Sequence, residues 1–154
     1  MTNTLELKLK TKFPSILIEL NNSSVTSCMK YGIEVDDGWY DLICNLCTEL
    51  QEWSDLNKKQ IVAKQIKEKF AGLRFYCGIE GDKDNVKDGS DFSQICKIIS
   101  KYEALSYETC ECTGGIGNIC KRGFVYKTLS KESACLFGFK ECNKSDWVVN
   151  NHEK

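Results

Sequence analysis

The segment from residue 110 to residue 123 holds most of the groups in this chain whose types could do chemistry. It contains the thiols of Cys110, Cys112 and Cys120, four glycines, and the adjacent cations Lys121 and Arg122. Thiolates bind zinc, cationic side chains bind anions, and glycines let backbone N–H groups approach a ligand closely. The segment therefore indicates a binding site, either for a metal or for an anion.

A zinc site needs about four ligands, which Cys110, Cys112, Cys120 and Cys135 could supply as thiolates. The Cys-x-Cys spacing of the first two is less usual than Cys-x-x-Cys, and the other two are not closely spaced. The alternative is that these thiols pack as small hydrophobic side chains. We therefore expect no cofactor, with zinc on these four residues as the alternative.

Catalysis by a cysteine or serine nucleophile requires a neighbouring base, most often histidine. The single histidine of the chain is His152, in a polar terminal segment. A carboxylate site built from Asp36, Asp37 and Asp41 is conceivable, but Asp-Asp-Gly before a helix more often caps that helix. The sequence therefore predicts a protein that binds a ligand and is not an enzyme.

Cations close to aromatic residues indicate a second kind of site. Arg74 precedes Tyr76, and Lys121 and Arg122 precede Phe124. Stacking combined with cation contacts holds nucleotide bases and phosphates in many proteins. We therefore predict a site for a small nucleotide-like ligand, contacted by Trp39, Arg74, Tyr76, Thr113, Gly114, Lys121 and Arg122. The alternative is a solvated cationic edge.

The bulk composition argues against several classes of partner. The chain of 154 residues has a formal net charge of -1, which gives no long-range attraction to nucleic acid or to an anionic membrane. Its apolar runs are too short to span a bilayer, and residues 1–8 do not resemble a secretory signal. We therefore expect the ten cysteines to stay reduced in a cytoplasm.

A continuous apolar face predicts a helix over residues 38–53. The residues on this face are Trp39, Leu42, Ile43, Leu46, Cys47, Leu50 and Trp53. An aspartate at position 36 or 37 is expected to cap the start of the helix. Cys44 and Cys47 form a Cys-x-x-Cys inside it, but Cys47 lies on the apolar face, so we expect packing and no redox chemistry.

Other patterns predict the remaining elements. Alternating apolar residues predict a β-hairpin over 60–70 and 73–78 that turns at Ala71 and Gly72. A second helix is expected over 91–107, with a buried stripe of Phe92, Ile95, Cys96, Ile99, Tyr102 and Leu105. Two short helices are expected over 5–20, the second with Pro14 in its first turn. A short strand at 124–126 is followed by a short helix between Ser130 and Gly138.

Together these elements predict one α+β domain over residues 1–150, followed by a frayed tail over 151–154. In this domain a small antiparallel sheet with the β-hairpin packs against the two main helices. The glycine- and cysteine-rich segment belongs to a C-terminal subregion of the same domain.

Several blocks of the chain resemble a family of small uncharacterised proteins found in phages and prophages. The blocks are Tyr31-Gly32-Ile33-Glu34, Asp37-Gly38-Trp39 with Leu42-Ile43, Lys67-Glu68-Lys69-Phe70-Ala71-Gly72-Leu73-Arg74-Phe75-Tyr76, Thr109-Cys110-Glu111 with Gly114 and Gly117, and Arg122-Gly123 with Lys127-Thr128-Leu129. They occur in the order of that family and cover residues 31–137.

The resemblance implies a zinc knuckle, because many relatives carry a Cys-x-x-Cys after the third block and further Cys and His beyond the Thr-Leu block. This chain departs from that pattern. Thr113 stands where the second cysteine would be, and Ser130 follows Leu129 where a cysteine is often found. The only histidine, His152, lies far downstream.

A phage-borne relative implies a location in the cytoplasm of a host cell. The resemblance, together with the predicted nucleotide site, suggests a counter-defence protein that sequesters a nucleotide-like signalling molecule. The alternative is a module that interacts with a host protein or a nucleic acid, with or without a zinc staple, and nucleic acid is the less favoured partner.

Overall fold

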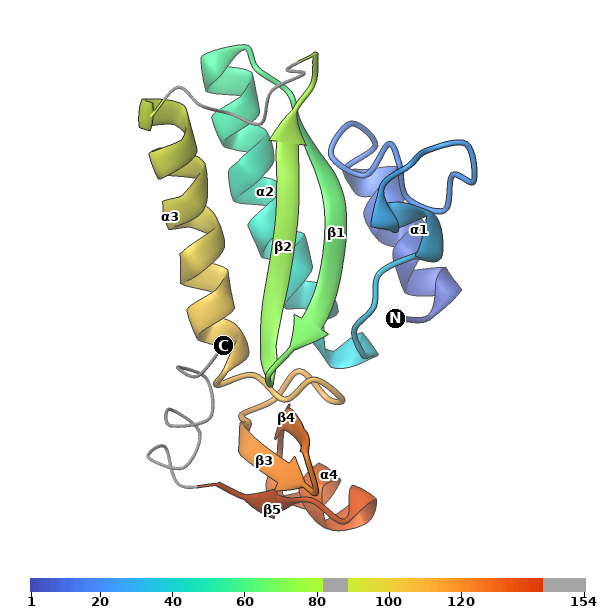
Figure 1. Ribbon diagram of the computed structural model, residues 1–154, viewed down its shortest axis with the longest axis vertical. Coiled ribbons are helices and arrows are strands. Elements are labelled where there is room, and N and C mark those ends of the chain that lie inside the picture. The colour runs from blue at the N-terminus through green and yellow to red at the C-terminus, as the bar shows by residue number, and fades with distance from the viewer. Residues whose placement is uncertain (82–88, 143–154) are drawn as a thin grey trace.

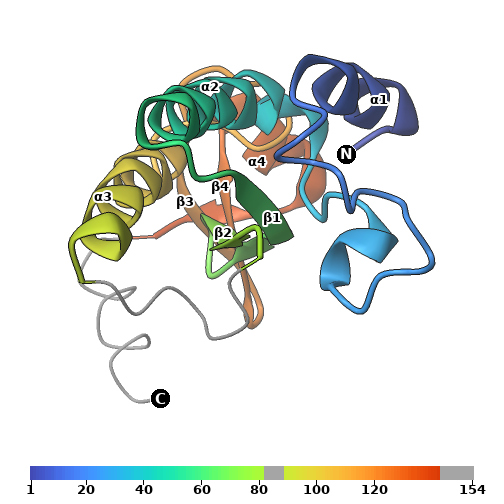
Figure 2. The same cartoon turned by 90° about the horizontal axis from the view of Figure 1, so that it is seen from above.

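The computed structural model describes residues 1–81 and 89–142. A two-stranded hairpin lies in front of one long helix, α2 (Tyr40–Asn57), and beside a second, α3 (Gly89–Ser106) (Figure 1). Seen from above, these helices and α1 (Asn3–Lys12) form an arc around the hairpin (Figure 2). The protein is therefore α+β, as predicted. None of the helices in the described ranges combines the length and apolar character that crossing a membrane requires.

Helix α2 forms because its apolar side chains share one face. Its buried apolar residues are Leu42, Ile43, Cys44, Leu46, Cys47, Leu50 and Trp53, which confirms the predicted face. The predicted aspartate cap is wrong: a 3₁₀ turn, η2 (Asp37–Trp39), precedes the helix, and no side chain caps either start. Asp36 instead pairs with Lys127, and Asp37 accepts a hydrogen bond from the backbone N–H of Thr2 at 2.7 Å.

The hairpin pairs β1 (Ile61–Lys69) with β2 (Gly72–Ile79), and its turn lies one residue earlier than predicted. Phe70 and Ala71 both have positive φ, 53° and 64°, as in the tight turns that suit the twist of a hairpin. The backbone N–H of Ala71 donates to Glu68 Oε1 at 2.7 Å. Gly72 serves packing, because a Cβ there would lie 2.4 Å from Cζ of Tyr107.

Both edges of the hairpin are covered. Along β1, the backbone N–H of Glu34 donates to the backbone oxygen of Ile66, and the backbone oxygen of Glu34 accepts from the N–H of Glu68, each at 3.0 Å. Along β2, the backbone N–H of Leu73 donates to the hydroxyl of Ser106 on α3 at 2.9 Å. Covered edges cannot pair with a strand of another chain at these positions.

Helix α3 buries less of its apolar stripe than predicted. Ile95 and Tyr102 are buried, but Phe92 is 53% exposed and Leu105 is 41% exposed. The hairpin and the other helices cover only part of the apolar face of this helix, so the rest of that face stays open. The prediction of a fully buried stripe is therefore wrong at these two positions.

The N-terminal segment forms one helix and not two. After α1, residues 14–21 form successive turns, so the predicted helix at Pro14 is wrong. The backbone oxygen of Ile16 accepts from Ala63 of β1 at 2.8 Å, which draws this segment onto the hairpin. Glu6 of α1 is buried and accepts at 2.6 Å from the backbone N–H of Ile33, just after the short 3₁₀ helix η1 (Cys28–Tyr31).

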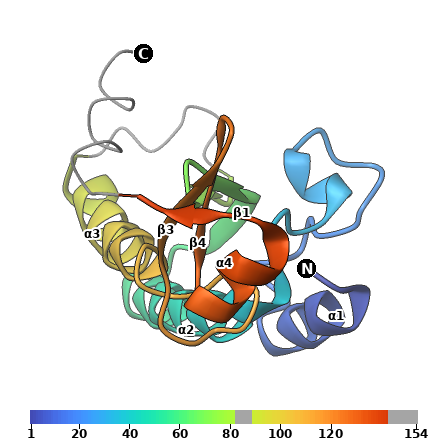
Figure 3. The same cartoon turned by 90° about the horizontal axis from the view of Figure 1, so that it is seen from below.

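The C-terminal region forms a second, smaller sheet beyond the turn of the hairpin (Figure 3). Its strand order is β4 (Val125–Leu129), β3 (Asn118–Arg122), β5 (Lys140–Glu141), and α4 (Lys131–Phe137) packs beside it. Only part of β4 was predicted. The predicted ends of α4 are confirmed: the Ser130 side chain accepts from the N–H of Ser133, and Gly138 has a φ of 70°.

The described residues form two hydrophobic cores. The larger lies between the hairpin and helices α1, α2 and α3. The smaller consists of Cys110, Cys120, Leu129, Ala134 and Phe139. The domain predicted over residues 1–150 therefore has a second core within it. Residues 143–150 and the predicted tail 151–154 lie outside the described residues, as do residues 82–88.

Candidate functional site

The seven residues predicted to contact a ligand lie in different parts of the fold. They are Arg74 and Tyr76 on β2, Thr113 and Gly114 in the loop against η2, Lys121 and Arg122 on β3, and Trp39 at the end of η2. Strand β3 belongs to the smaller sheet, whereas β2 belongs to the hairpin. The fold therefore does not gather these side chains around one point.

Trp39 is not accessible to a ligand, contrary to the prediction that it contacts one. Its side chain is 0% exposed, and its indole Nε1 donates to the backbone oxygen of Thr109 at 2.8 Å. A buried tryptophan normally satisfies its single donor in this way. The residue therefore attaches the start of α2 to the segment that follows α3.

Thr113 and Gly114 meet the backbone of η2 and leave no room for a ligand there. A Cβ on Gly38 would lie 2.5 Å from the backbone nitrogens of both residues, so the two segments touch directly. The N–H of Gly38 donates to the oxygen of Glu111 at 2.8 Å. Gly114 has a φ of 76°, in the region that favours glycine. Here the glycines permit close backbone packing.

The same neighbourhood includes the turn of the hairpin and the end of β4. The hydroxyl of Thr128 donates to the backbone oxygen of Ala71 at 2.8 Å, and the N–H of Glu111 donates to the oxygen of Thr128 at 2.9 Å. We call the contacts among residues 36–39, 68–72, 109–114 and 127–129 the junction. It joins the two cores, and several of the blocks that carry the phage-family resemblance contribute to it.

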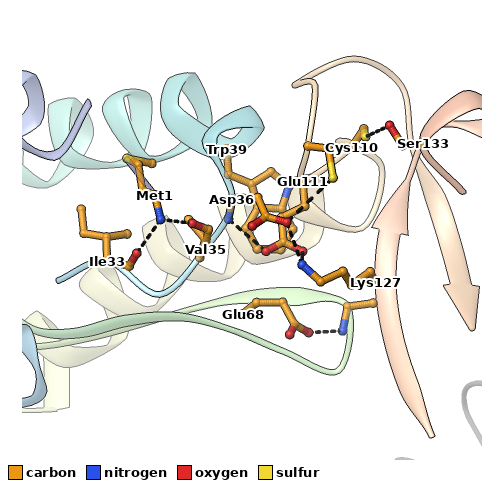
Figure 4. Close-up of polar contacts among 12 residues, drawn as sticks. Met1, Ile33, Val35, Asp36, Trp39, Glu68, Cys110, Glu111, Lys127 and Ser133 are labelled. Carbon is orange, nitrogen blue, oxygen red and sulfur yellow. Dashed lines mark hydrogen bonds and ion pairs between the residues drawn. The ribbon is translucent and has the colours of Figure 1, made fainter. Parts of the chain in front are cut away.

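An ammonium between two carboxylates lies at the centre of the junction (Figure 4). Lys127 Nζ is 2.7 Å from Asp36 Oδ2 and 3.0 Å from Glu111 Oε2. Glu111 is buried, and its Oε1 accepts from the backbone N–H of Asp36 at 3.1 Å. Its Oε2 finds no partner of hydrogen-bond geometry among the described residues, so it relies on the charge of Lys127.

The electrostatics of this trio favour a structural role. Burial raises the pKa of the Glu111 carboxyl, although Lys127 opposes the rise. Burial would lower the pKa of Lys127, but Asp36 and Glu111 raise it. The ammonium therefore stays charged at neutral pH and is neutralised locally. An ion pair closed in this way offers no free base to a substrate.

The cations of the smaller sheet contact aromatic side chains other than Phe124, and each belongs to its own local pair. The Arg122 guanidinium lies 4.7 Å from the ring centroid of Phe139, and Nη1 donates to the backbone oxygen of Phe137 at 2.7 Å. Lys121 Nζ lies 5.3 Å from the ring centroid of Tyr126. These contacts attach β3 to its neighbours.

The fold does not assemble the four thiols of the alternative zinc site. Cys110 Sγ lies 3.7 Å from Ser133 Oγ, whereas Cys112 Sγ lies 3.8 Å from Asp36 Oδ2, so the two thiols point to different sides of their loop. Cys120 is buried in the small core and Cys135 is exposed. Across residues 1–81 and 89–142, no three Cys, His, Asp or Glu side chains are grouped to hold a metal ion.

Cys110 has an unusual environment for a thiol that is 0% exposed. Burial alone would raise its pKa, but hydrogen bonds to the sulfur lower it to about 7. The donors are the Thr113 hydroxyl and the backbone N–H groups of Ser130, Thr113 and Cys112. The loop is therefore shaped to hold a negatively charged sulfur.

The thiols of Cys47 and Cys112 are less acidic than that of Cys110. Burial raises the pKa of Cys47, which is packed on the apolar face of α2 together with Cys44. This confirms the expectation that the Cys-x-x-Cys in that helix packs. Burial, with Asp36 adding to it, raises the pKa of Cys112 to about 11. Both Cys47 and Cys112 are protonated at neutral pH and are weak nucleophiles.

A groove of about 490 Å³ between β2 and α3 was not predicted. Its main lining residues are Phe75, Tyr76, Phe92, Ile95, Ile99 and Glu103, and of the seven predicted residues only Tyr76 lines it. The sequence contains one signal of it: the apolar face of α3 is wider than a two-stranded sheet can cover.

One end of the groove is polar. Glu103 lines it, and the guanidinium of Arg74 lies near this carboxylate and donates to Tyr107 Oη at 2.9 Å. Burial raises the pKa of Glu103, and Arg74 partly opposes this. Lys67 Nζ lies 5.6 Å from the ring centroid of Tyr76, which is 47% exposed. Two cations and an accessible aromatic ring therefore meet at this end.

Comparisons of the chain with protein-family models, with curated proteins and with solved structures found no match. The resemblance to the phage family therefore depends on the sequence blocks alone. The function has to be inferred from the geometry of the chain itself.

Proposed function

We propose that this protein is a non-catalytic binding protein that holds a small nucleotide-like ligand in the groove between β2 and α3. The observation that carries the proposal is the groove itself. Its volume of about 490 Å³ falls in the range of small-molecule sites, and its walls include the aromatic rings of Phe75, Tyr76 and Phe92. A planar ring is the natural occupant of such walls, because stacking favours it.

The polar end of the groove suits the rest of such a ligand. A base stacked on Tyr76 would place its sugar and phosphate towards Lys67 and Arg74. The ammonium of Lys67 already lies over the Tyr76 ring, so it could contact a phosphate after a small side-chain movement. Arg74 contributes a guanidinium whose planar donors match phosphate oxygens. The carboxylate of Glu103 is the acceptor in the same place and could bind an amino group of a base.

The groups in the groove favour holding a ligand over transforming it. Burial raises the pKa of Cys77 in the groove to about 12, so its thiol is protonated at neutral pH. The described residues include no histidine, since the single one is His152. Glu103 has a raised pKa but no partner acid or base in the groove lining beyond thiols and Tyr76. General acid–base catalysis lacks a pair of groups here.

The resemblance to a phage-borne family suggests what such binding achieves. A protein that removes a nucleotide-like signalling molecule from the host cytoplasm would block a defence response without destroying the molecule. We therefore propose a counter-defence role by sequestration, in the cytoplasm of an infected cell.

The replacement Tyr76→Ala tests the groove. Thermal-shift titration with cyclic dinucleotides and ADP-ribose-type nucleotides should show stabilisation of the wild type by one of them. Tyr76→Ala should weaken that ligand by roughly 5- to 150-fold, the loss expected for one stacked base. Tyr31→Ala is the matched control, because Tyr31 is an exposed tyrosine that carries a lysine, Lys30, 5.0 Å from its ring centroid. Stabilisation by none of these nucleotides, or equal loss in both variants, contradicts the proposal.

A second candidate is a protein-interaction module, favoured by the apolar tip of the smaller sheet. Phe124 is 98% exposed at the end of the β3–β4 hairpin, beside the exposed Val125. Arg122 pairs with Val125 in the sheet and contacts the backbone of the exposed Phe137. Aromatic residues around an arginine are typical of the centre of a protein interface.

The replacement Phe124→Asp separates this candidate from the first. If a host protein binds the tip, Phe124→Asp should abolish a stoichiometric complex isolated from infected cells, and Tyr76→Ala should leave that complex intact. The reverse pattern, with nucleotide binding lost only in Tyr76→Ala and no dependence on Phe124, would exclude the tip as the functional surface.

A further inference from the structure

Two pairs of side chains have the spacing that zinc knuckles use for their ligands. Cys110 and Thr113 are separated by two residues, and so are Ser130 and Ser133. The first pair lies in the loop after α3, and the second lies at the start of α4. Where such positions hold cysteine or histidine, two pairs in this arrangement usually bind one metal ion between them.

The fold brings the two pairs together. Cys110 Sγ lies 3.7 Å from Ser133 Oγ, and Ser133 Oγ lies 3.2 Å from Ser130 Oγ. Thr113 lies in the tight turn that Cys110 begins, because the N–H of Gly114 donates to the backbone oxygen of Cys110 at 2.8 Å, and the Thr113 hydroxyl helps to lower the pKa of the Cys110 thiol. The side chains of Cys110, Ser133 and Ser130 are therefore linked in a row, with Thr113 in the adjoining turn, so the two pairs face each other as the two halves of a knuckle site would.

These four side chains do not fit zinc as they stand. Zinc sites in proteins use thiolates, imidazoles and carboxylates, and this set has one thiol and three hydroxyls. The other thiols of the region point elsewhere: Cys112 towards Asp36, and Cys120 to the backbone oxygen of Asn118 at 3.3 Å. The resemblance to a family with a zinc knuckle therefore conflicts with the donors present at this point.

We infer that Cys110, Thr113, Ser130 and Ser133 form a two-knuckle scaffold closed by hydrogen bonds in place of a metal ion. The loop retains the features that a metal thiolate requires. Backbone N–H groups of its own loop and of Ser130 help to lower the pKa of the Cys110 thiol, and its sulfur lies 3.7 Å from Ser133 Oγ. The N–H of Gly114 donates to the oxygen of Cys110 at 2.8 Å and tightens the turn. The junction packs closely beside the small core and stabilises it.

The replacement of the three hydroxyls tests this scaffold. A triple variant, Thr113→Cys with Ser130→Cys and Ser133→Cys, should bind about one zinc ion per chain. Its cobalt complex should show the absorption of tetrahedral thiolate coordination, and zinc should raise its Tm by roughly 5 °C or more. The wild type should show neither effect, and chelators should leave its Tm unchanged. The triple variant with Cys110→Ser added should bind metal at least about tenfold more weakly.

Two results would overturn the inference. One is a triple variant, refolded with zinc present, that binds no more zinc than the wild type. The other is a wild-type protein that binds zinc and loses this binding when Cys110 is replaced by serine. A second variant needs no new metal site: Ser133→Ala in the wild type should lower Tm equally with and without a chelator. An effect of the chelator on that difference would also contradict the inference. None of these results depends on a nucleotide ligand, so the test is separate from the proposed function.

Discussion

Gly38→Ala should lower the free energy of unfolding by about 3 kcal/mol or more, the upper range for an added methyl group with no space to occupy. The new Cβ would lie 2.5 Å from the backbone nitrogens of Thr113 and Gly114 and 2.6 Å from the backbone oxygen of Cys110. All three atoms belong to backbone, which cannot rotate away as a side chain can. The junction would have to open, and the N–H of Gly38 would lose its bond to Glu111. Urea or guanidinium unfolding of the two proteins measures the change.

Gly89→Ala is the matched control. A Cβ on Gly89, at the start of α3, would meet no atom within 4 Å, so alanine should be neutral or slightly stabilising there. Equal stability of Gly38→Ala and Gly89→Ala would mean that η2 and the loop of Thr113 and Gly114 do not touch as described.

Lys127→Met should cost about 3–5 kcal/mol of stability at neutral pH. The replacement keeps the length of the side chain but leaves the buried Glu111 carboxylate without the ammonium 3.0 Å away. A buried charge that loses its partner is strongly destabilising. Denaturant unfolding at several pH values measures both the loss and its dependence on pH.

The loss should be larger at pH 8 than at pH 5. Burial already raises the pKa of Glu111 above its unfolded value, and removing Lys127, which lowers it, raises it further. An acid whose pKa is higher in the folded state binds more protons when folded, so stability falls as pH rises from about 4.3 through the folded pKa. At low pH the carboxyl is protonated and no longer needs the ammonium.

Two variants complete this experiment. Lys101→Met removes the ammonium from a pair with Glu49 in which both side chains are more exposed, and it should cost about 1 kcal/mol or less. Lys127→Met combined with Glu111→Gln should regain part of the stability lost in the single variant, because no buried charge remains. A loss of stability in Lys127→Met that is small and independent of pH would show that Lys127 does not stabilise the buried carboxylate of Glu111.

The junction also explains the sequence blocks that resemble the phage family. Trp39, Gly72, Glu111 and Thr128 lie in those blocks, and each makes a contact between segments distant in the chain. The glycines and charges of these blocks therefore hold the two cores together. The groove lies elsewhere, between β2, which belongs to one of the blocks, and α3, which lies outside them.

Local patterns were enough for the elements whose residues repeat with a clear period. The apolar face of α2 has helical spacing, so the helix was predicted, although it runs from Tyr40 to Asn57 and not over 38–53. Ser130 and Gly138 carry their own cap chemistry, so the ends of α4 were predicted correctly. The hairpin was predicted for the same reason, with its turn misplaced by one residue. The turn includes a hydrogen bond from the backbone N–H of Ala71 to the Glu68 carboxylate, a contact that periodicity does not contain.

By itself, the sequence determined the α+β class, the main helices, the hairpin and the packing of Cys47 on the apolar face of α2, because burial and periodicity act over neighbouring residues. Only the tertiary structure decided where the chemistry-bearing residues lie. Trp39 and Gly114 became junction contacts, Lys121 and Arg122 stayed in the smaller sheet, and Cys110 met Ser133 instead of another thiol. Such meetings depend on which segments pack together across long stretches of chain, and no local spacing encodes that choice.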